Sequence, residues 1–423
     1  MTAEADEVRI TRLGAGGDGV AETVQGPCYV PFALPGELVR RVAGGLPELM
    51  SAPSPQRQRP QCRHFGSCGG CLAQHMAQEL YADWKRGILL AAFRQRGLAA
   101  EVAPLRGVAS GTRRRAVFTA RRQGGELVFG LHRRRSAEVF AVAECPVLVP
   151  AIVAGLAGLR AIAAALAEEE VRLTVLATPA GLDVALESAA KALNARRVAA
   201  LAQLASAHAI ARLAHNGEIV AERARPELML GGVAVVPPPG LFVQAVGEAE
   251  TALIGEVLAN LGKPRRVVDL FAGLGTFSLA LARHAQVLAV DGEGRALAAL
   301  AEAKRRATGL KPILTKVRDL MREPLSAKEL EAYDCVVLDP PRAGAQAQAR
   351  QIGRARVPRV VYVSCNPATL ARDARTLVDG GFALQRVVPI DQFLYSAHLE
   401  VVAVFCRGAA AAENRARSAA ART

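Results

Sequence analysis

The chain has 423 residues, of which 51% are hydrophobic and 22% are charged, and its formal net charge is +14. That length suffices for about three domains of an ordinary soluble protein. The basic excess favours nucleic acid or an anionic membrane surface as a partner, and no apolar run approaches a membrane span. Residues 1–12 are polar and acidic, so we expect no signal peptide and a cytoplasmic location. Because disulfides are rare there, the eight cysteines indicate metal binding or catalysis.

Short strands separated by glycine- and proline-containing turns are predicted within residues 7–45. The apolar runs lie at 20–24, 28–32 and 38–42. Several short strands in so little chain favour a small closed β-barrel of the OB type, which has no open edges. The first predicted domain, residues 1–58, comprises this barrel and a linker. The same pattern also fits a generic β-module without a ligand.

Three cysteines follow with the spacing C-x5-C-x2-C, namely Cys62, Cys68 and Cys71. Cys145 is the fourth candidate of the set. Four thiolates can hold a cubane iron–sulfur cluster or a structural zinc ion, and the spacing leaves both open. The two glycines between Cys68 and Cys71 permit a tight turn that directs amides at sulfur. These cysteines therefore predict a metal centre.

Residues 73–96 have the apolar spacing of an amphipathic helix, which we assign to core packing. An arginine-rich hairpin follows. Guanidinium groups suit bidentate phosphate contacts, so we interpret the hairpin as an RNA-contacting surface, with a merely solvated charged face as the alternative. Its eight arginines are Arg113, Arg114, Arg115, Arg121, Arg122, Arg133, Arg134 and Arg135.

Alanine-rich helices are predicted at residues 150–169 and 190–206, and strands or hairpins at 171–188 and 209–236. Together with the cysteine-rich segment they predict a central α+β domain over residues 59–239.

The remaining chain alternates strands and helices, which predicts a doubly wound parallel sheet of the Rossmann-like α/β class over residues 240–408. Residues 409–423 are small, basic and polar, and we expect a partly ordered, flexible tail. The predicted strands of this domain are 267–271, 287–290, 334–338, the strand before Cys365, and 398–405.

The first of these strands leads into a glycine turn with Gly273 and Gly275. Ser278 stands where a dinucleotide-binding fingerprint has its third glycine or an alanine. Asp291 follows the second strand and could accept hydrogen bonds from both ribose hydroxyls. An adenosine ligand without a pyrophosphate, S-adenosylmethionine, therefore fits this pattern better than NAD.

Cys365 lies where a β-branched strand ends and a helix capped by Asn366 begins. Ligands bind at this edge of open α/β sheets, and a helix N-terminus favours a thiolate. We interpret Cys365 as a nucleophile. The alternative is a buried cysteine that packs as a small hydrophobe.

Two carboxylates are candidates to act with it. Asp339 ends another strand and is followed by two prolines, where it can hold the polar edge of a base. Arg342 stands where an amine methyltransferase would have an aromatic residue, which argues against that class. Glu400 follows His398 by two positions in the last predicted strand and is a candidate general base, or else a salt-bridge partner.

In chain order these motifs resemble those of the RNA uracil-C5 methyltransferase family. Two departures are Ala272, which replaces a common cysteine, and Asp291, which replaces a more usual glutamate. The matching residues are Cys62, Cys68, Cys71 and Cys145; Phe242-Val243-Gln244; Asp269-Leu270-Phe271-Ala272-Gly273; Asp339-Pro340-Pro341-Arg342; Ser364-Cys365-Asn366-Pro367; and His398-Leu399-Glu400.

The resemblance implies an RNA-binding TRAM-type barrel and a [4Fe–4S] cluster, rather than zinc, on the four cysteines. It also implies that S-adenosylmethionine is the methyl donor. By this similarity the cofactor is contacted by residues near the glycine turn, with Asp339 beside both cofactor and base. They are Gln244, Phe271, Gly273, Gly275, Thr276, Asp291, Asp319 and Asp339.

The resemblance further implies that Cys365 attacks C6 of uracil and that Glu400 removes the C5 proton after methyl transfer. The expected substrate is 23S rRNA, with tRNA as the first alternative. An adenine or protein-amine methyltransferase and a non-catalytic iron–sulfur RNA-binding protein are further alternatives. We expect a monomer without an obligate protein partner.

Overall fold

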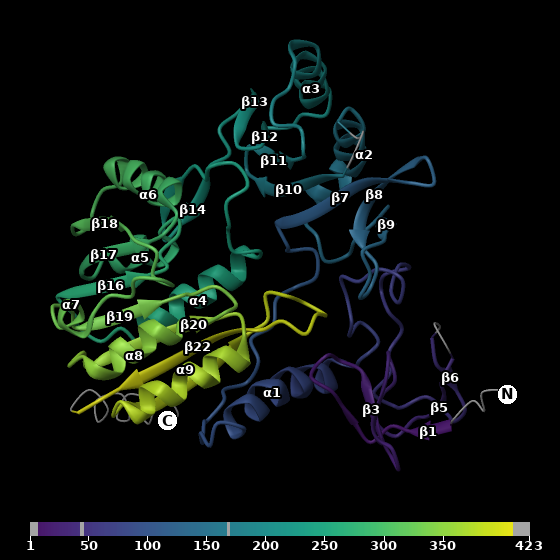
Figure 1. Cartoon of the computed structure of the whole chain (residues 1–423), viewed down its shortest axis with the longest axis horizontal. Coiled ribbons are helices and arrows are strands. Elements are labelled where there is room, and N and C mark those ends of the chain that lie inside the picture. The colour runs from purple at the N-terminus through teal and green to yellow at the C-terminus, as the bar shows by residue number, and fades with distance from the viewer. Residues whose placement is uncertain (1–6, 43–45, 167–169, 409–423) are drawn as a thin grey trace.

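The computed structural model describes residues 7–42, 46–166 and 170–408 (Figure 1). The predicted tail, residues 409–423, lies outside the described residues. In Figure 1 the N-terminal strands lie at the lower right, a central sheet at the top and a second large sheet at the left. No helix in the described part of the chain has the length and apolar character needed to cross a bilayer.

The N-terminal strands form two three-stranded antiparallel sheets, with strand orders β1-β5-β6 and β2-β3-β4. Val8, Ile10, Ala21, Val30 and Val39 share one small core. No ladder joins the two sheets within the described ranges, so closure into a barrel stays a prediction. The strands are β1 (Glu7–Arg9), β2 (Arg12–Leu13), β3 (Gly19–Thr23), β4 (Gly26–Val30), β5 (Leu38–Arg40) and β6 (Glu48–Leu49).

Helix α1 (Gln78–Arg94) is shorter than the predicted helix 73–96. The segment before Gln78 is not helical because its backbone amides bond to other parts of the chain. The amides of Leu72 and Ala73 donate to the Tyr395 carbonyl, and the Ala77 amide donates to the Gln56 carbonyl. These hydrogen bonds to distant residues hold the segment before Gln78 out of the helix.

The central sheet has seven strands in the order β13-β12-β11-β10-β7-β8-β9, antiparallel except for β11 with β12. Pro150 is the first residue of α2, and the Asn194 side chain caps α3. Residues 167–169 of the predicted first helix lie outside the described residues. The elements are β7 (Arg115–Gln123), β8 (Glu126–His132), β9 (Val139–Ala141), α2 (Pro150–Ala164), β10 (Val171–Thr178), β11 (Gly181–Glu187), α3 (Ala195–Ala207), β12 (Arg212–His215) and β13 (Glu218–Glu222).

The C-terminal sheet also has seven strands, in the order β18-β17-β16-β19-β20-β22-β21. Its first five strands are β18 (Ile313–Val317), β17 (Gln286–Asp291), β16 (Arg266–Leu270), β19 (Cys335–Leu338) and β20 (Arg359–Ser364). These five are parallel to one another.

The prediction of a wholly parallel sheet is wrong at one end. β22 (Glu400–Cys406) runs antiparallel to β20, and β21 (Ala383–Ile390), which was not predicted, runs antiparallel to β22 at the edge. The loop 391–399 joins these two strands without a helix, and a parallel pairing would need a longer crossover. Strand β18 was also not predicted; it lies at the edge of the sheet, and four of its five residues are exposed.

Helices cover both faces of this sheet. On one face Leu253, Phe277 and Leu297 pack from α4, α5 and α6, together with the β14–β15 hairpin. On the other face α8 and α9 pack beside α1. The elements are α4 (Gly247–Ala259), α5 (Thr276–Leu281), α6 (Gly294–Arg306), α7 (Ala327–Leu330), α8 (Gln346–Arg354), α9 (Pro367–Asp379), β14 (Leu228–Leu230) and β15 (Val233–Val235).

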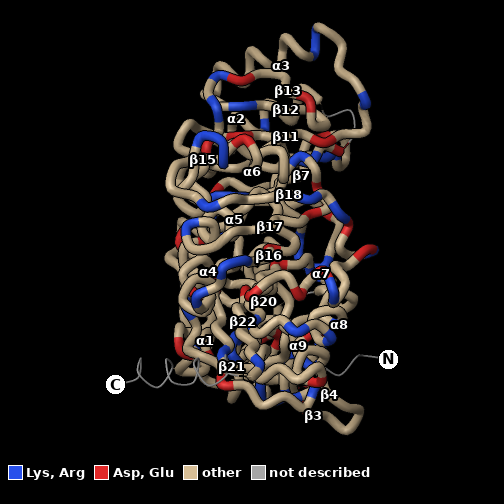
Figure 2. The backbone as a smooth tube through the Cα atoms, turned by 90° about the vertical axis from the view of Figure 1, so that its left-hand side faces the viewer, with Lys and Arg blue, Asp and Glu red and all other residues tan. Residues whose placement is uncertain are grey.

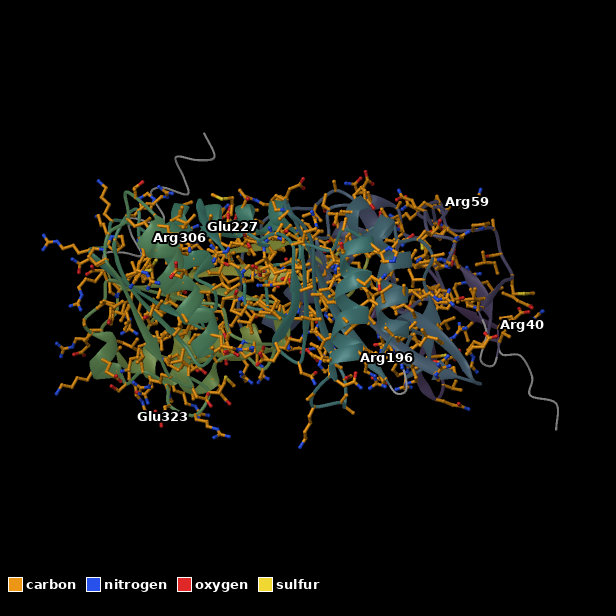
Figure 3. All side chains as sticks on the ribbon, turned by 90° about the horizontal axis from the view of Figure 1, so that it is seen from above. Arg40, Arg59, Arg196, Glu227, Arg306 and Glu323 are labelled. Atoms are coloured by element: carbon orange, nitrogen blue, oxygen red, sulfur yellow. The ribbon has the colours of Figure 1, made fainter. Side chains whose placement is uncertain are left out.

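Helix α1 links the central part of the chain to this sheet (Figure 1). Leu89 and Phe93 of α1 are buried in the same core as Leu370 and Leu377 of α9. Each such side chain contributes about 1.5–3 kcal/mol when fully buried. The cysteine-bearing segment before α1 is thereby held against the sheet edge that carries Cys365. In Figure 3 the labelled charged residues, among them Arg59 and Glu323, lie at the outside of the molecule.

Candidate active site

Cys365 lies directly between β20 and α9, as predicted. The Asn366 side chain caps the helix by accepting from the Ala368 amide at 3.1 Å. Its Nδ2 also donates to the Arg342 carbonyl at 2.9 Å. The loop after β19, which carries Asp339 and Arg342, is therefore tied to the loop that carries Cys365.

Glu400 is the first residue of β22 and is buried. Its Oε1 accepts a hydrogen bond of 2.9 Å from Nε2 of Gln392, a residue of the loop before β22. Its Oε2 is buried and has no hydrogen-bond partner. An unpartnered carboxylate oxygen near the Cys365 thiol can accept a proton, so the geometry is compatible with the predicted general base.

Gln392 continues the network toward Asp339. Its Nε2 also donates to Gln244 Oε1 at 2.7 Å, and Gln244 Nε2 donates to Asp339 Oδ2 at 3.3 Å. Three of the predicted residues, Gln244, Asp339 and Glu400, are thus joined through a residue that sequence reasoning missed. The signal that could have found it is its place at the carboxyl end of β21, a strand that was itself not predicted.

The charges of the site raise the pKa values of its acidic groups. Burial, followed by the neighbouring Asp339 carboxylate, raises the pKa of Glu400 to about 8. Burial also raises the pKa of Asp339 to about 7. Both carboxyl groups are therefore within reach of protonation near neutral pH, which is typical of acid–base sites.

The prediction that the helix N-terminus favours a Cys365 thiolate is wrong for the protein by itself. Burial, with the nearby Glu400 and Asp339 carboxylates, raises the pKa of the Cys365 thiol to about 11. Arg342 opposes this shift but does not outweigh it. Burial is the largest cause of this shift, and the two carboxylates from distant parts of the chain add to it.

His398 does not share a strand face with Glu400. It lies in the loop before β22 and is exposed, whereas Glu400 is buried. Its Nε2 lies 2.6 Å from Nη2 of Arg342. Although His398 is solvent-accessible, the surrounding cavity walls partly desolvate its ring. This desolvation, followed by the cations Arg342, Lys85 and Arg113, lowers the pKa of His398 to about 4, so the imidazole is neutral and accepts from the guanidinium.

The glycine turn after β16 fits a nucleotide-type ligand. Phe271 has a φ of 61°, a left-handed conformation rarely adopted outside glycine and often found at ligand sites. A Cβ built at Gly273 would meet no atom within 4 Å, whereas one at Gly275 would collide with Leu300 of α6. Gly273 therefore leaves room for a ligand, and Gly275 is needed for helix packing.

Acidic side chains surround this turn. Asp291 Oδ2 accepts from the Gly273 amide at 2.8 Å and Oδ1 from the Glu293 amide at 2.7 Å. Asp269 is buried, and its Oδ1 has no partner. Asp319 lies against Gly292, next to Asp291. These are the positions where a bound nucleoside would supply hydroxyl or amine donors.

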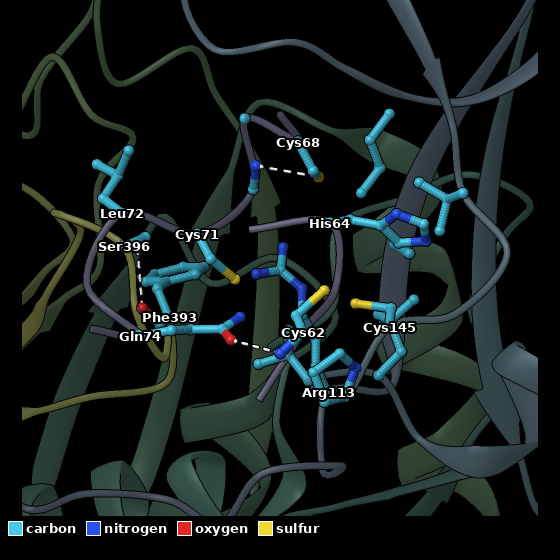
Figure 4. A pocket seen from close by; sticks show the side chains of 18 of the residues that line it. Cys62, His64, Cys68, Cys71, Leu72, Gln74, Arg113, Cys145, Phe393 and Ser396 are labelled. Carbon is cyan, nitrogen blue, oxygen red and sulfur yellow. Dashed lines mark hydrogen bonds between the residues drawn. The ribbon is translucent and has the colours of Figure 1, made fainter. Parts of the chain in front are cut away.

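The four predicted metal ligands line one cavity of about 500 Å³ (Figure 4). Burial, together with the charges of the other three cysteines, raises the pKa of the Cys71 thiol to about 12. As predicted, the Gly70 amide is directed at the Cys68 sulfur, at 3.4 Å. Within the described residues no three cysteine, histidine or acidic side chains converge closely enough to hold one metal ion.

The cysteine cavity reaches the catalytic loops. Arg342, Phe393 and His398 line it together with the cysteines. A second cavity of about 390 Å³ is lined by Cys365 and shares Arg342 and His398 with the first. The Arg342–His398 pair therefore lines both the cavity of the four cysteines and the cavity of Cys365.

Comparison with known proteins decides the family. Residues 239–407 match the family described as tRNA (Uracil-5-)-methyltransferase. An uncharacterized RNA methyltransferase of Brucella suis is 47% identical over 96% of this chain and 99% of its own length. The 23S rRNA (uracil(1939)-C(5))-methyltransferase of Chromohalobacter salexigens is 35% identical over 96% of this chain and 90% of its own.

The chain belongs to the RNA uracil-C5 methyltransferase family. The solved structure of the Pyrococcus abyssi tRNA (uracil-54, C5)-methyltransferase in complex with S-adenosyl-L-homocysteine has the same fold as this methyltransferase. It has a TM-score of 0.73 and 22% identity, and it covers 95% of this chain and 100% of its own. The resemblance seen in the motifs is confirmed. The alternatives of an amine methyltransferase and a non-catalytic RNA-binding protein are set aside.

The arginine hairpin of this methyltransferase carries less unpaired charge than its sequence suggested. Carboxylates outside the hairpin pair with five of its eight arginines. Over the backbone as a whole, Figure 2 shows Asp and Glu interspersed with Lys and Arg. The pairs are Arg114–Glu250, Arg121–Glu170, Arg133–Glu138, Arg134–Asp18 and Arg135–Asp18. Contact between the hairpin and RNA stays a prediction.

Proposed function

We propose that this chain methylates C5 of a uridine in 23S rRNA, with S-adenosylmethionine as the methyl donor. The observation that carries the proposal is the meeting of Cys365, Asp339 and Glu400 at one sheet edge, where Glu400 has a buried oxygen without a partner. A thiol nucleophile, a base-holding carboxylate and a free proton acceptor are what substitution at uracil C5 requires.

Cys365 acts first in this scheme. Its thiolate forms a bond to C6 of uracil, and the electron pair of the C5–C6 double bond moves toward C5 and the O4 carbonyl. Because the thiol pKa is raised to about 11 in the protein alone, the thiol proton must leave before attack. Asp339 is the nearby base that takes it, so Glu400 stays deprotonated for the C5 proton. S-adenosylmethionine supplies the electrophilic methyl group that C5 then takes up.

Glu400 completes the reaction. Its Oε2 accepts the proton from C5, the C5–C6 double bond re-forms, and the Cys365 sulfur leaves as the thiolate. A positioned base of this kind contributes roughly 10²–10⁴-fold to the rate. Asp339, held by Gln244, is placed to accept or donate a hydrogen bond at the polar edge of the uracil.

We further propose that the cofactor is held at the glycine turn. Phe271, Gly273 and Thr276 would form one wall, and Asp291 and Asp319 would receive its hydroxyl and amine groups. The left-handed Phe271 and the open space at Gly273 support this assignment. Gln244 would contact the cofactor from the side that also holds Asp339.

The four cysteines would hold a [4Fe–4S] cluster. All four thiols line one cavity, and burial raises the pKa values of Cys68, Cys71 and Cys145, so a cationic iron centre would be needed to displace their protons. The sulfur-only ligand set suits iron–sulfur chemistry, and the Gly70 amide adds a hydrogen bond to the Cys68 sulfur.

The choice of 23S rRNA is supported by the similarity to the Chromohalobacter salexigens enzyme, which extends over nearly the whole chain. The Pyrococcus abyssi structure is related in fold, and tRNA stays the alternative substrate. We propose that the N-terminal strands, as a TRAM-type module, and the exposed arginines contribute phosphate contacts. Flipping the uridine out of its stack costs a few kcal/mol, which such contacts would offset.

To test this proposal, anaerobically purified protein is incubated with methyl-labelled S-adenosylmethionine and with either unmodified rRNA or unmodified tRNA, in separate reactions. Labelled nucleosides are then identified by mass spectrometry. Label in 5-methyluridine from rRNA alone is the expected result. Label in 5-methyluridine from tRNA alone would mean that the substrate is tRNA, while the proposed C5 methylation would stand. Label in another nucleoside would refute the proposal.

A further inference from the structure

Gln392 is buried, and each of its polar atoms has a partner. Its two Nε2 hydrogens go to Gln244 Oε1 at 2.7 Å and to Glu400 Oε1 at 2.9 Å, and its Oε1 accepts from the Ala245 amide at 3.1 Å. The amide orientation is therefore fixed from three sides. A buried amide whose donors and acceptor all have hydrogen-bond partners holds those partners in one arrangement.

The two oxygens of Glu400 are made unequal by this contact. Oε1 is held by Gln392, whereas Oε2 is buried with no partner. A free carboxylate could rotate and present either oxygen. With Oε1 tied to Gln392, Oε2 is the oxygen that has no hydrogen bond and can accept a proton.

The backbone that carries Gln392 is held just as firmly. The preceding residue, Asp391, accepts from Lys85 Nζ at 2.9 Å and from Tyr81 Oη at 2.5 Å, and all three side chains are buried. Tyr81 and Lys85 belong to α1. The position of Gln392 is therefore fixed from α1 and by its own side chain.

We propose that Gln392 is the positioning residue of the general base, selecting Glu400 Oε2 as the oxygen that takes the C5 proton and coupling it to the Gln244–Asp339 pair. This inference rests on the proposed function. Gln392 does not touch the reacting atoms and acts through Glu400.

The electrostatics agree with that role. The ionisable groups that face Glu400 are Asp339 and Arg342 from the loop after β19 and Cys365 from the loop after β20. Asp339 raises the pKa of Glu400, while the Gln392 hydrogen bond and Arg342 lower it. Without the Gln392 amide, Glu400 would hold its proton to higher pH and would be a free base over a smaller part of the neutral range.

The test uses Gln392→Met, which conserves volume but removes both donors. The reaction is run with the rRNA substrate in a single turnover and quenched in denaturant, and the covalent protein–RNA adduct is followed on a gel. We expect the methylated adduct to form and to decay roughly 10–100-fold more slowly than in the wild type, as for a lost hydrogen bond to a charged group. The rising limb of the pH–decay profile should move to higher pH by roughly one unit.

Gln385→Met is the matched control, because Gln385 lies on β21, the strand that leads into the Gln392 loop, and its side-chain amide donates to the nearby Ala383 carbonyl. It should decay like the wild type. Cofactor affinity and thermal unfolding of both variants show whether the fold is kept. If the Met variant does not fold, Gln392→Asn replaces it in the test. Its amide is one methylene too short for both contacts, so the pH–decay profile should shift in the same direction.

Two failures are distinguishable. If the wild type forms neither 5-methyluridine nor an adduct, the proposed function is wrong. If the wild type reacts but Gln392→Met changes only stability or cofactor affinity, with the decay rate and pH profile unmoved, the residue is structural and the inference is overturned.

Discussion

Lys85 Nζ donates a 2.9 Å hydrogen bond to Asp391 Oδ1, and both side chains are completely buried. The two residues are 306 positions apart in the sequence. The same ammonium group also bonds to the carbonyl oxygens of Phe393 and His398. One lysine of α1 therefore holds the loop 391–399, which presents Gln392 and leads into Glu400.

Substitution Lys85→Met should destabilise the protein and slow methyl transfer. It leaves the Asp391 carboxylate buried without its cation, which costs about 3–5 kcal/mol. Loss of the loop anchor should also lower kcat more than cofactor affinity. Denaturant unfolding and single-turnover rates measure the two effects, with the exposed Lys263→Met as the control. Equal stability of the two variants would contradict this account of the loop.

Substitution Cys365→Ala should abolish 5-methyluridine formation, by on the order of 10³-fold or more, because no other group can add to C6. S-adenosylmethionine affinity, measured by calorimetry, should stay within a few-fold of the wild type. Cys28→Ser, in the N-terminal strands, is the matched thiol control. Retained methylation by Cys365→Ala would exclude the covalent mechanism.

The buried Asp269 should make stability fall as pH rises. Burial raises its pKa from 3.8 to about 7, so between these values the folded chain binds the proton that the unfolded chain has released. The unfolding free energy then decreases from about pH 4 to about pH 7, by on the order of 1–4 kcal/mol.

Substitution Asp269→Asn should remove that part of the pH dependence, while the Asn oxygen still accepts from Ser278. Urea unfolding at several pH values between 5 and 8 should show the variant gaining stability relative to the wild type as pH rises. Asp379→Asn, on the surface of α9, is the control. A constant difference across this pH range would rule out the raised pKa of Asp269.

Substitution Cys71→Ser should lower the iron and sulfide content of anaerobically purified protein and remove the broad visible absorption of an iron–sulfur cluster. Thermal stability should fall with it, because the amides of Leu72 and Ala73, directly after Cys71, bond to Tyr395 in the catalytic loop. Cys335→Ser tests a buried core thiol outside the cavity and should keep its iron. Zinc without iron in the wild type would refute the cluster.

Arg134 and Arg135 should behave differently although they are neighbours that share the buried Asp18. The Arg134 side chain is 15% exposed and lies over the Phe32 ring, so Arg134→Ala should cost about 1–3 kcal/mol of stability. The Arg135 side chain is 71% exposed, so Arg135→Ala should instead weaken RNA binding and reduce its salt slope by about one. Unfolding and salt-dependent RNA titrations measure the two outcomes, and the reverse order would contradict these assignments.

The family could be recognised from the sequence because the residues that match it lie in short contiguous motifs. Strand-to-helix junctions placed Cys365 and the glycine turn, and the spacing of Cys62, Cys68 and Cys71 placed the cysteine cavity. These features depend on a few neighbouring residues, so local propensity suffices to locate them.

Contacts between distant segments decided the rest. The sequence could not show that Asp18 pairs with Arg134 and Arg135, or that burial and two carboxylates raise the pKa of the Cys365 thiol, since burial and charge pairing depend on what folds against a residue. Gln392 is an ordinary glutamine in the sequence. Its proposed role depends on β21, the antiparallel strand that was not predicted, because the loop after β21 places Gln392 between Gln244 and Glu400. In that low-dielectric core a hydrogen bond to a carboxylate is stronger than in water.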